Sequence, residues 1–125
     1  MRRGVKVFFD GGWRPATGME TAVVVRGQDY VRQGLGPGSA IEAEWLALIE
    51  AVRIAGELGL AEPVFLGDSL AVIGQAKAAV SCGSDCQQHL ETLSGLLAAT
   101  AKVRLRHVKR TQNLAGIALT RLHVR

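Results

Sequence analysis

Three acidic residues lie where the predicted elements change, and their type suggests metal chemistry. Asp10 follows an apolar run at 7–9, Glu44 lies in the first turn of a predicted helix, and Asp68 follows an apolar run at 63–67. Each has an ordinary explanation on its own, as an Asp-Gly turn, an acid at a helix N-terminus and a helix cap, respectively. Together they offer carboxylate oxygens, the hard ligands that Mg²⁺ or Mn²⁺ prefers.

Such a set of carboxylates suits the hydrolysis of phosphodiesters, because divalent cations activate water and stabilise the leaving oxygen of an in-line displacement. Like charges within a few Å repel each other, and proteins tolerate them mainly when a cation neutralises them. The carboxyl ends of strands and the start of a covering helix meet at one crevice of an α/β sheet. We therefore expect Asp10, Glu44 and Asp68 to converge there.

Hydrophobic patterning supplies the elements that would position these acids. Short β-branched and aromatic runs predict strands, and apolar residues at helical spacing predict helices. The chain of 125 residues is expected to fold as one α/β domain, residues 1–125, with a mixed sheet. The predicted order is βββαβααβα, with strands at 4–10, 21–26 and 29–34, a helix at 41–58, a strand at 63–67, helices at 68–79 and 85–101, a strand at 103–108 and a helix at 113–122.

Charge is distributed unevenly along the chain. The formal net charge is +4, but seven of the 15 Lys and Arg residues lie within 101–125, a segment without Asp or Glu. A basic segment of this kind is typical of a surface that binds phosphates, and a solvated basic face is the alternative. We expect nucleic acid as the partner, and the sequence indicates no particular protein partner. Aromatic residues are only 5% of the chain, which argues against extensive stacking on bases.

Other classes of protein are disfavoured by composition. The sequence has no apolar run of about eighteen residues that could span a membrane, and its first residues do not resemble a signal peptide. A cytoplasmic protein is therefore the default expectation. Cys82 and Cys86 with His89 lack a fourth ligand at the spacing of a zinc site, so reduced thiols are expected instead.

Three motifs surround the acids: FFDGG at 8–12, AEWLAL at 43–48 and GDSLAVIGQ at 67–75. In this order they resemble the motifs of the ribonuclease H family, in particular its short bacterial and archaeal type-one branch, often labelled reverse-transcriptase-like. The resemblance implies a five-stranded mixed sheet of order 3-2-1-4-5 flanked by helices. It also implies an Mg²⁺- or Mn²⁺-dependent endonuclease that hydrolyses the RNA strand of RNA/DNA hybrids, with Asp10, Glu44 and Asp68 as catalytic residues and metal ligands.

Contacts with nucleic acid are expected from residues beside the acids and from the basic segment. Trp13 has two interpretations, a cover for a sugar or base or an exposed turn aromatic, whereas Trp45 lies on the apolar stripe of the long helix and is expected in the core. The expected contacts are Gly11, Gly12, Trp13, Arg14, Ser69, Lys109, Arg110 and Asn113.

The sequence departs from the family pattern at its fourth acid. That acid follows an Asn near the start of the last helix, in the pattern Asn, two residues, Ala, Asp, and the gapless alignment places Ile117 there. The side-chain carbonyl of Asn113 lies one helical turn earlier on the same face and is a possible substitute ligand, with helix N-capping as its alternative.

Residues that read the substrate also differ from the family pattern. Ala16-Thr17-Gly18 stands where the family often has Asn-Pro-Gly, and Ala40-Ile41 stands where it has paired Asn. Those amides read the minor groove and its 2′-hydroxyls. The sequence is therefore compatible with three classes of protein: a metal-dependent nuclease, a catalytically degenerate nucleic-acid-binding module of the same fold, and a protein-interaction domain with a vestigial acidic cluster.

Overall fold

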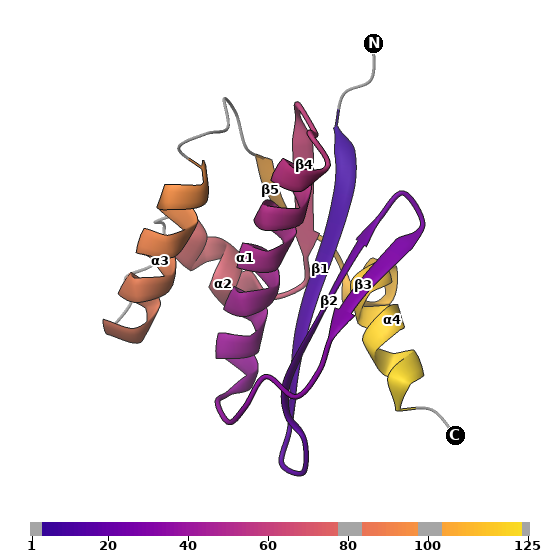
Figure 1. Cartoon of the computed structure of the whole chain (residues 1–125), viewed down its shortest axis with the longest axis vertical. Helices are drawn as coiled ribbons and strands as arrows, with labels where there is room; N and C mark the ends of the chain where they lie inside the picture. The colour runs from indigo at the N-terminus through magenta and orange to yellow at the C-terminus, as the bar shows by residue number, and fades with distance from the viewer. Residues whose placement is uncertain (1–3, 78–83, 98–103, 124–125) are drawn as a thin grey trace.

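The computed structural model describes residues 4–77, 84–97 and 104–123 (Figure 1). Its strands are β1 (Val5–Arg14), β2 (Gly18–Val25), β3 (Gln28–Arg32), β4 (Pro63–Gly67) and β5 (Arg104–His107). Its helices are α1 (Ala40–Glu57), α2 (Leu70–Ala76), α3 (Ser84–Leu97) and α4 (Leu114–Leu122), preceded by the short 3₁₀ helix η1 (Arg110–Gln112). The order of strands and α-helices confirms the predicted βββαβααβα.

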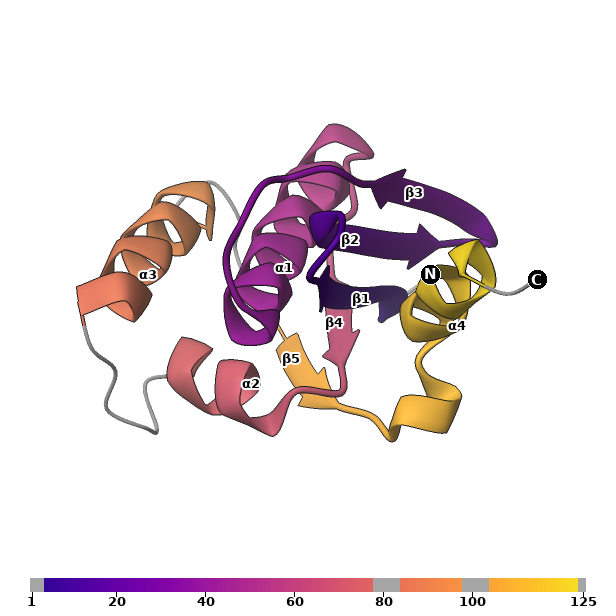
Figure 2. The ribbon, with the colours of Figure 1, turned by 90° about the horizontal axis from the view of Figure 1, so that it is seen from below.

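The five strands form one mixed sheet of order β3-β2-β1-β4-β5, as predicted. β1 pairs antiparallel with β2 and parallel with β4, while β2–β3 is antiparallel and β4–β5 is parallel. Helices α1, α2 and α3 lie on one side of the sheet and α4 lies on the other (Figures 1 and 2). Parallel strands β1, β4 and β5 therefore end at the same edge of the sheet.

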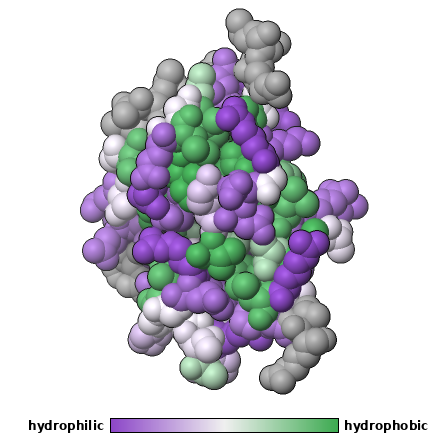
Figure 3. All heavy atoms as spheres, turned by 45° about the vertical axis from the view of Figure 1, so that its right-hand side comes forward, coloured by the Kyte–Doolittle hydropathy of each residue, from purple (hydrophilic) through white to green (hydrophobic). Residues whose placement is uncertain are grey.

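Alternation along β1 divides the core between the two faces of the sheet. Val7 and Phe9 belong to the large apolar cluster under α1, whereas Phe8 packs against the smaller cluster under α4. Trp45 lies in the large cluster as predicted, and its indole N–H donates to Gln75 Oε1 at 2.8 Å. The side of the molecule that carries β3 and α4 shows hydrophobic surface among hydrophilic side chains (Figure 3).

β1 is longer than predicted and places Asp10 within the strand, so the expectation that Asp10 ends it was wrong. The Gly-Gly pair that was interpreted as the end of the strand continues it, with Gly11 opposite Thr21. A Cβ on Gly11 would lie 2.2 Å from the carbonyl carbon of Ala43, so glycine here permits close approach of α1. The pairing of β1 with β4 ends at Phe8, and Asp10 therefore still projects just beyond the carboxyl end of β4.

Serine residues begin the first two helices. Ser39 Oγ accepts from the Glu42 N–H at 3.1 Å and caps α1, as its position predicted. In α2 the capping side chain is Ser69, whose Oγ accepts from the Val72 N–H at 3.3 Å. Because Ser69 satisfies this helix end, the Asp68 carboxylate is not needed as its cap.

The expectations about membrane spans and about the two cysteines can each be compared with the residues that the structure describes. None of the helices in 4–77, 84–97 and 104–123 is both long and apolar enough to cross a membrane. Cys86 is buried, whereas Cys82 lies outside the described residues.

Candidate active site

β1, α1 and β4 bring the three predicted acids together. One carboxylate oxygen from each of Asp10, Glu44 and Asp68 lies within 4.8 Å of the other two. Within the described part of the chain, this is the one group of three or more His, Cys, Asp or Glu residues close enough to hold a metal ion. The structure thus confirms that the three side chains lie close together at the carboxyl edge of the sheet.

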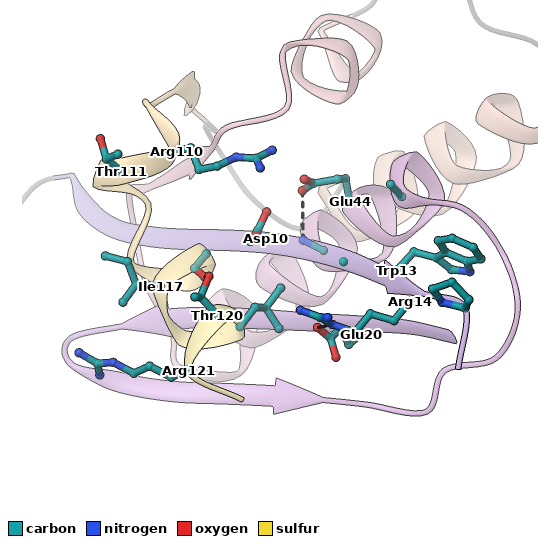
Figure 4. A pocket seen from close by; sticks show the side chains of 16 residues that line it. Asp10, Trp13, Arg14, Glu20, Glu44, Arg110, Thr111, Ile117, Thr120 and Arg121 are labelled. Atoms are coloured by element: carbon teal, nitrogen blue, oxygen red, sulfur yellow. Dashed lines mark hydrogen bonds and ion pairs between the residues drawn. The ribbon is translucent and has the colours of Figure 1, made fainter. Parts of the chain in front are cut away.

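Two hydrogen bonds fix the acids in this arrangement. The Gly11 N–H donates to Glu44 Oε1 at 3.1 Å, which ties the start of α1 to β1 (Figure 4). Asn113, at the start of α4, is fully buried, and its Nδ2 donates to Asp68 Oδ2 at 3.2 Å and to the Phe9 carbonyl at 3.0 Å. The site is therefore preorganised by groups from both faces of the sheet.

The acids are held in an environment that disfavours their ionised forms. Burial, and then the charge of Asp68, raise the pKa of Asp10 from 3.8 to about 6. Burial, and then the charge of Asp10, raise the pKa of Glu44 from 4.5 to about 9. The positive charge of Arg110 acts in the opposite direction on Asp10. A divalent cation would relieve this repulsion, so the donor set and its electrostatics fit Mg²⁺ or Mn²⁺.

The orientation of Asn113 favours the capping interpretation over the substitute-ligand interpretation. Its Oδ1 accepts from the Ala115 N–H at 3.1 Å and thereby caps α4. Its amide hydrogens, not its carbonyl oxygen, face Asp68. In this arrangement Asn113 holds a neighbouring carboxylate in place and offers no free oxygen to a cation.

Comparison with known proteins identifies the family. The sequence model of a family described as reverse transcriptase-like matches residues 9–123 of this chain. The chain belongs to this family. A comparison with curated protein sequences gives no match.

Solved ribonuclease H structures share the fold of this reverse transcriptase-like chain. RNase H1 from the halophilic archaeon Halobacterium salinarum NRC-1 has a TM-score of 0.83 and 25% identity over 92% of each chain. The N-terminal RNase H domain of a Mycobacterium tuberculosis protein has a TM-score of 0.78 and 22% identity, over 93% of this chain and 95% of that one. LC11-RNase H1 in complex with an RNA/DNA hybrid has a TM-score of 0.77 and 17% identity, over 87% and 88%.

The helix on which the motif resemblance predicts a fourth acid, α4, approaches the acidic cluster without offering a carboxylate. A Cβ on Gly116 would lie 3.2 Å from Asp10 Oδ2 and 3.7 Å from Asp68 Oδ2, so the backbone of α4 comes close to the cluster. Ile117, which the motif alignment places at the fourth acid, has 36% of its surface exposed and lines the adjoining groove. This reverse transcriptase-like chain therefore has three clustered acids among its described residues.

A groove of about 720 Å³ extends from Asp10 and Glu44 between β1, β2 and α4 (Figure 4), and Asp68 does not line it. Arg110 reaches toward the acids from η1, and Arg14 and Arg121 lie along the rest of the groove. Of the predicted nucleic-acid contacts, five line it and three do not. Those that line it are Gly11, Gly12, Trp13, Arg14 and Arg110; those that do not are Ser69, Lys109 and Asn113.

Sequence analysis missed a buried acid in the same groove. Glu20, with 3% of its surface exposed, lies opposite Gly12 on β2 and lines the groove. Its Oε2 and Oε1 lie 2.8 and 3.0 Å from His123 Nε2, and its Oε2 lies 3.8 Å from Arg14 Nε. The predicted strand began at 21. Extending its alternation by one residue would have placed Glu20 on the same face as Ala22, which lies opposite Asp10.

Proposed function

We propose that this chain is a divalent-metal-dependent endonuclease that hydrolyses the RNA strand of RNA/DNA hybrids and functions as a single domain of residues 1–125. The observation that carries the proposal is the meeting of Asp10, Glu44 and Asp68 within 4.8 Å, with Asp10 and Glu44 lining a groove. Membership of the reverse transcriptase-like family supports it, and so does the likeness to LC11-RNase H1, which was solved in complex with an RNA/DNA hybrid.

The roles of the chain's own groups follow from their positions. Asp10, Glu44 and Asp68 would hold Mg²⁺ or Mn²⁺, which supplies activation of water and stabilisation of the leaving oxygen. The Gly11 N–H and the Asn113 amide keep Glu44 and Asp68 oriented through their hydrogen bonds. These two carboxylates thus enter the reaction already aligned, which lowers the reorganisation that binding would otherwise require.

Arginines on two sides of the acids would hold the substrate. Arg110 lies on the η1 side of the groove, and Arg14 lies beyond Gly12 at the end of β1. A guanidinium group matches the geometry of phosphate oxygens and can donate two hydrogen bonds to them. A backbone bound by both residues would therefore cross the acids between them, which places a phosphodiester at the reacting position.

A second candidate function is a nucleic-acid-binding module without efficient catalysis. The observation that favours it is the Gly116-Ile117 pair, which lacks the fourth acid where α4 approaches the cluster. Both functions predict salt-sensitive binding, because both rely on contacts between cationic side chains and phosphates. Only the nuclease predicts cleavage that needs a divalent cation.

The test of the proposed function is cleavage of an end-labelled RNA/DNA hybrid in Mg²⁺, in Mn²⁺ and in EDTA, with DNA and RNA duplexes of the same sequence beside it. We expect internal cuts in the RNA strand of the hybrid with either cation and none in EDTA. Salt-sensitive binding without cleavage would favour the binding module. Absence of both binding and cleavage would contradict both functions and leave a protein-interaction domain.

Restoring the fourth acid is expected to raise the rate. Ile117→Asp adds a carboxylate to α4, whose backbone comes close to the acids at Gly116. About 1.4 kcal/mol of added transition-state stabilisation would correspond to about tenfold in rate. Single-turnover cleavage of the hybrid measures this, and Ile117→Asn is the matched control because its side chain has a similar shape without the charge. An equal rate in wild type and Ile117→Asp, with an unchanged melting temperature, would show that the missing ligand does not limit activity.

A further inference from the structure

A second cationic surface lies on the α4 side of the sheet, over β4, β5 and the first residues of β1. On that side α4 packs on β1, β2 and β3 (Figure 2). Val7 of β1, Phe65 of β4 and Leu105 of β5 pack with the apolar cluster on the opposite side, under α1. Because successive side chains alternate between the faces of a sheet, the residues flanking them in each strand face the α4 side.

Two rows of residues cross β1, β4 and β5 on this side, and we call them together the open face. The strand register places Lys6 beside Val64 and Val64 beside Arg104, and it places Phe8 beside Leu66 and Leu66 beside Arg106. The rows are thus Lys6–Val64–Arg104 and Phe8–Leu66–Arg106. Basic side chains from both ends of the sequence therefore lie on one surface. The concentration of charge in 101–125 alone did not indicate that Lys6 belongs to it.

The most exposed side chains of the open face are cationic, and Phe8 is only partly exposed. Val64 and Leu66 have 8% and 6% of their surface exposed, while Lys6 and Arg106 are exposed. Long basic side chains cover apolar neighbours with their methylene groups and leave their charged ends in water. A surface of this kind lacks the apolar core typical of a protein–protein interface and instead matches the charge of a phosphate backbone.

One acid lies beside the open face and is already paired. Glu62 Oε1 lies 3.4 Å from Arg104 Nη2, and both side chains are 40% exposed. Among the described residues, Lys6 and Arg106 have no ion pair of this kind, so their positive charges are available to a ligand. These two residues are therefore the part of the surface that a test should address.

The open face leads directly to the acids. Lys6, Phe8 and Asp10 alternate onto the same side of β1, and Asp68 directly follows the end of β4, two residues after Leu66. At about 3.3 Å per residue, the row with Arg106 lies about 7 Å from the acids along the strands and the row with Lys6 lies about 13 Å away. Successive phosphates of one strand advance by about 3.4 Å along a duplex, so these rows correspond to about two and four nucleotides.

We infer that the open face binds the sugar-phosphate backbone of the substrate duplex about two to four nucleotides from the cleaved bond, through Lys6 and Arg106. The inference rests on the proposed function, because it assigns a second contact surface to the same substrate. It predicts that a long hybrid binds more tightly, and with steeper salt dependence, than a short hybrid that covers only the acids.

The test is the double variant Lys6→Gln with Arg106→Gln, measured by equilibrium binding to a hybrid of about 30 base pairs in EDTA at several KCl concentrations. The logarithm of the association constant falls as log[KCl] rises, and each lost phosphate contact makes this slope shallower by about 0.9. Loss of both contacts should therefore reduce the magnitude of the slope by nearly two. Affinity at about 100 mM KCl should fall about tenfold or more by the same relation.

Two further variants isolate the position of the charge from its amount. Arg26→Gln with Lys77→Gln removes the same two charges from exposed sites outside the open face and should leave the slope unchanged. Lys6→Arg with Arg106→Lys retains the charges and should keep the wild-type slope. An unchanged slope in the Gln variant, while wild type binds and cleaves the hybrid, would overturn this inference alone. A wild type that neither binds nor cleaves the hybrid would overturn the proposed function as well.

Discussion

Replacement of Asp10 by Asn is expected to lower the rate of hybrid cleavage about a thousandfold or more. Asp10 offers a carboxylate oxygen within 4.8 Å of one oxygen of Glu44 and one of Asp68. A cation bound by the other two acids would therefore also be bound by Asp10. The amide is uncharged and binds a hard cation more weakly than a carboxylate does. Metal stabilisation is worth several kcal/mol, and about 4 kcal/mol corresponds to about 10³ in rate. Single-turnover cleavage at saturating Mg²⁺ measures the loss.

Binding separates this loss from a general defect. In EDTA the Asp10→Asn protein should bind the hybrid at least as tightly as wild type, because a negative charge has been removed beside the phosphates. Asp29→Asn is the matched control, since Asp29 is an exposed acid of β3 and should leave the rate unchanged. A rate within a few-fold of wild type in Asp10→Asn would contradict the assignment of Asp10 as a catalytic metal ligand.

The stability of the metal-free protein is expected to fall as the pH rises from about 4 to about 9. The pKa values of Asp10 and Glu44 are raised to about 6 and about 9 in the folded protein, above those of the unfolded chain. The folded state therefore binds more protons than the unfolded state over this range, and raising the pH favours unfolding. Each unit of pKa difference is worth about 1.4 kcal/mol, so the total loss is on the order of several kcal/mol.

Urea unfolding in EDTA at a series of pH values measures this effect. Added Mg²⁺ should restore stability at pH near 8, because a ligand that binds the ionised carboxylates stabilises the folded state. Glu44→Gln should remove most of the pH dependence, whereas Glu50→Gln, an acid of α1 outside the cluster, should retain it. A metal-free stability that rises with pH across this range would contradict the electrostatic description of the site.

The three acids could be predicted because residue type and local pattern both pointed to them. Apolar runs marked the strands before Asp10 and Asp68, and helical periodicity placed Glu44 in the first turn of a helix expected from 41; α1 starts at Ala40, so Glu44 lies just past the first turn. The length of β1 could not be predicted in the same way. Glycines after Asp10 have the pattern of a turn, and only the contact of Gly11 with the backbone of α1 explains why they continue the strand.

The remaining features of the site depend on contacts between residues that are far apart in the sequence, which local patterns cannot predict. Glu20 meets His123 across 103 positions, and no local signal in β2 indicates that pairing. Asn113 begins a helix, so its own neighbourhood could not decide between a cap and a metal ligand. The bond from its amide to the Phe9 carbonyl, 104 positions away, fixes the direction in which its oxygen points.

Binding of Mg²⁺ or Mn²⁺, followed by isothermal titration calorimetry, tests the assignment of the acids most directly. Wild type is compared with Asp68→Asn and with Glu20→Gln, which removes a buried acid of the same groove that lies outside the cluster of three. We predict saturable binding to wild type and Glu20→Gln, and its loss in Asp68→Asn. Equal binding by all three proteins, or none by wild type, would contradict a cation site formed by Asp10, Glu44 and Asp68.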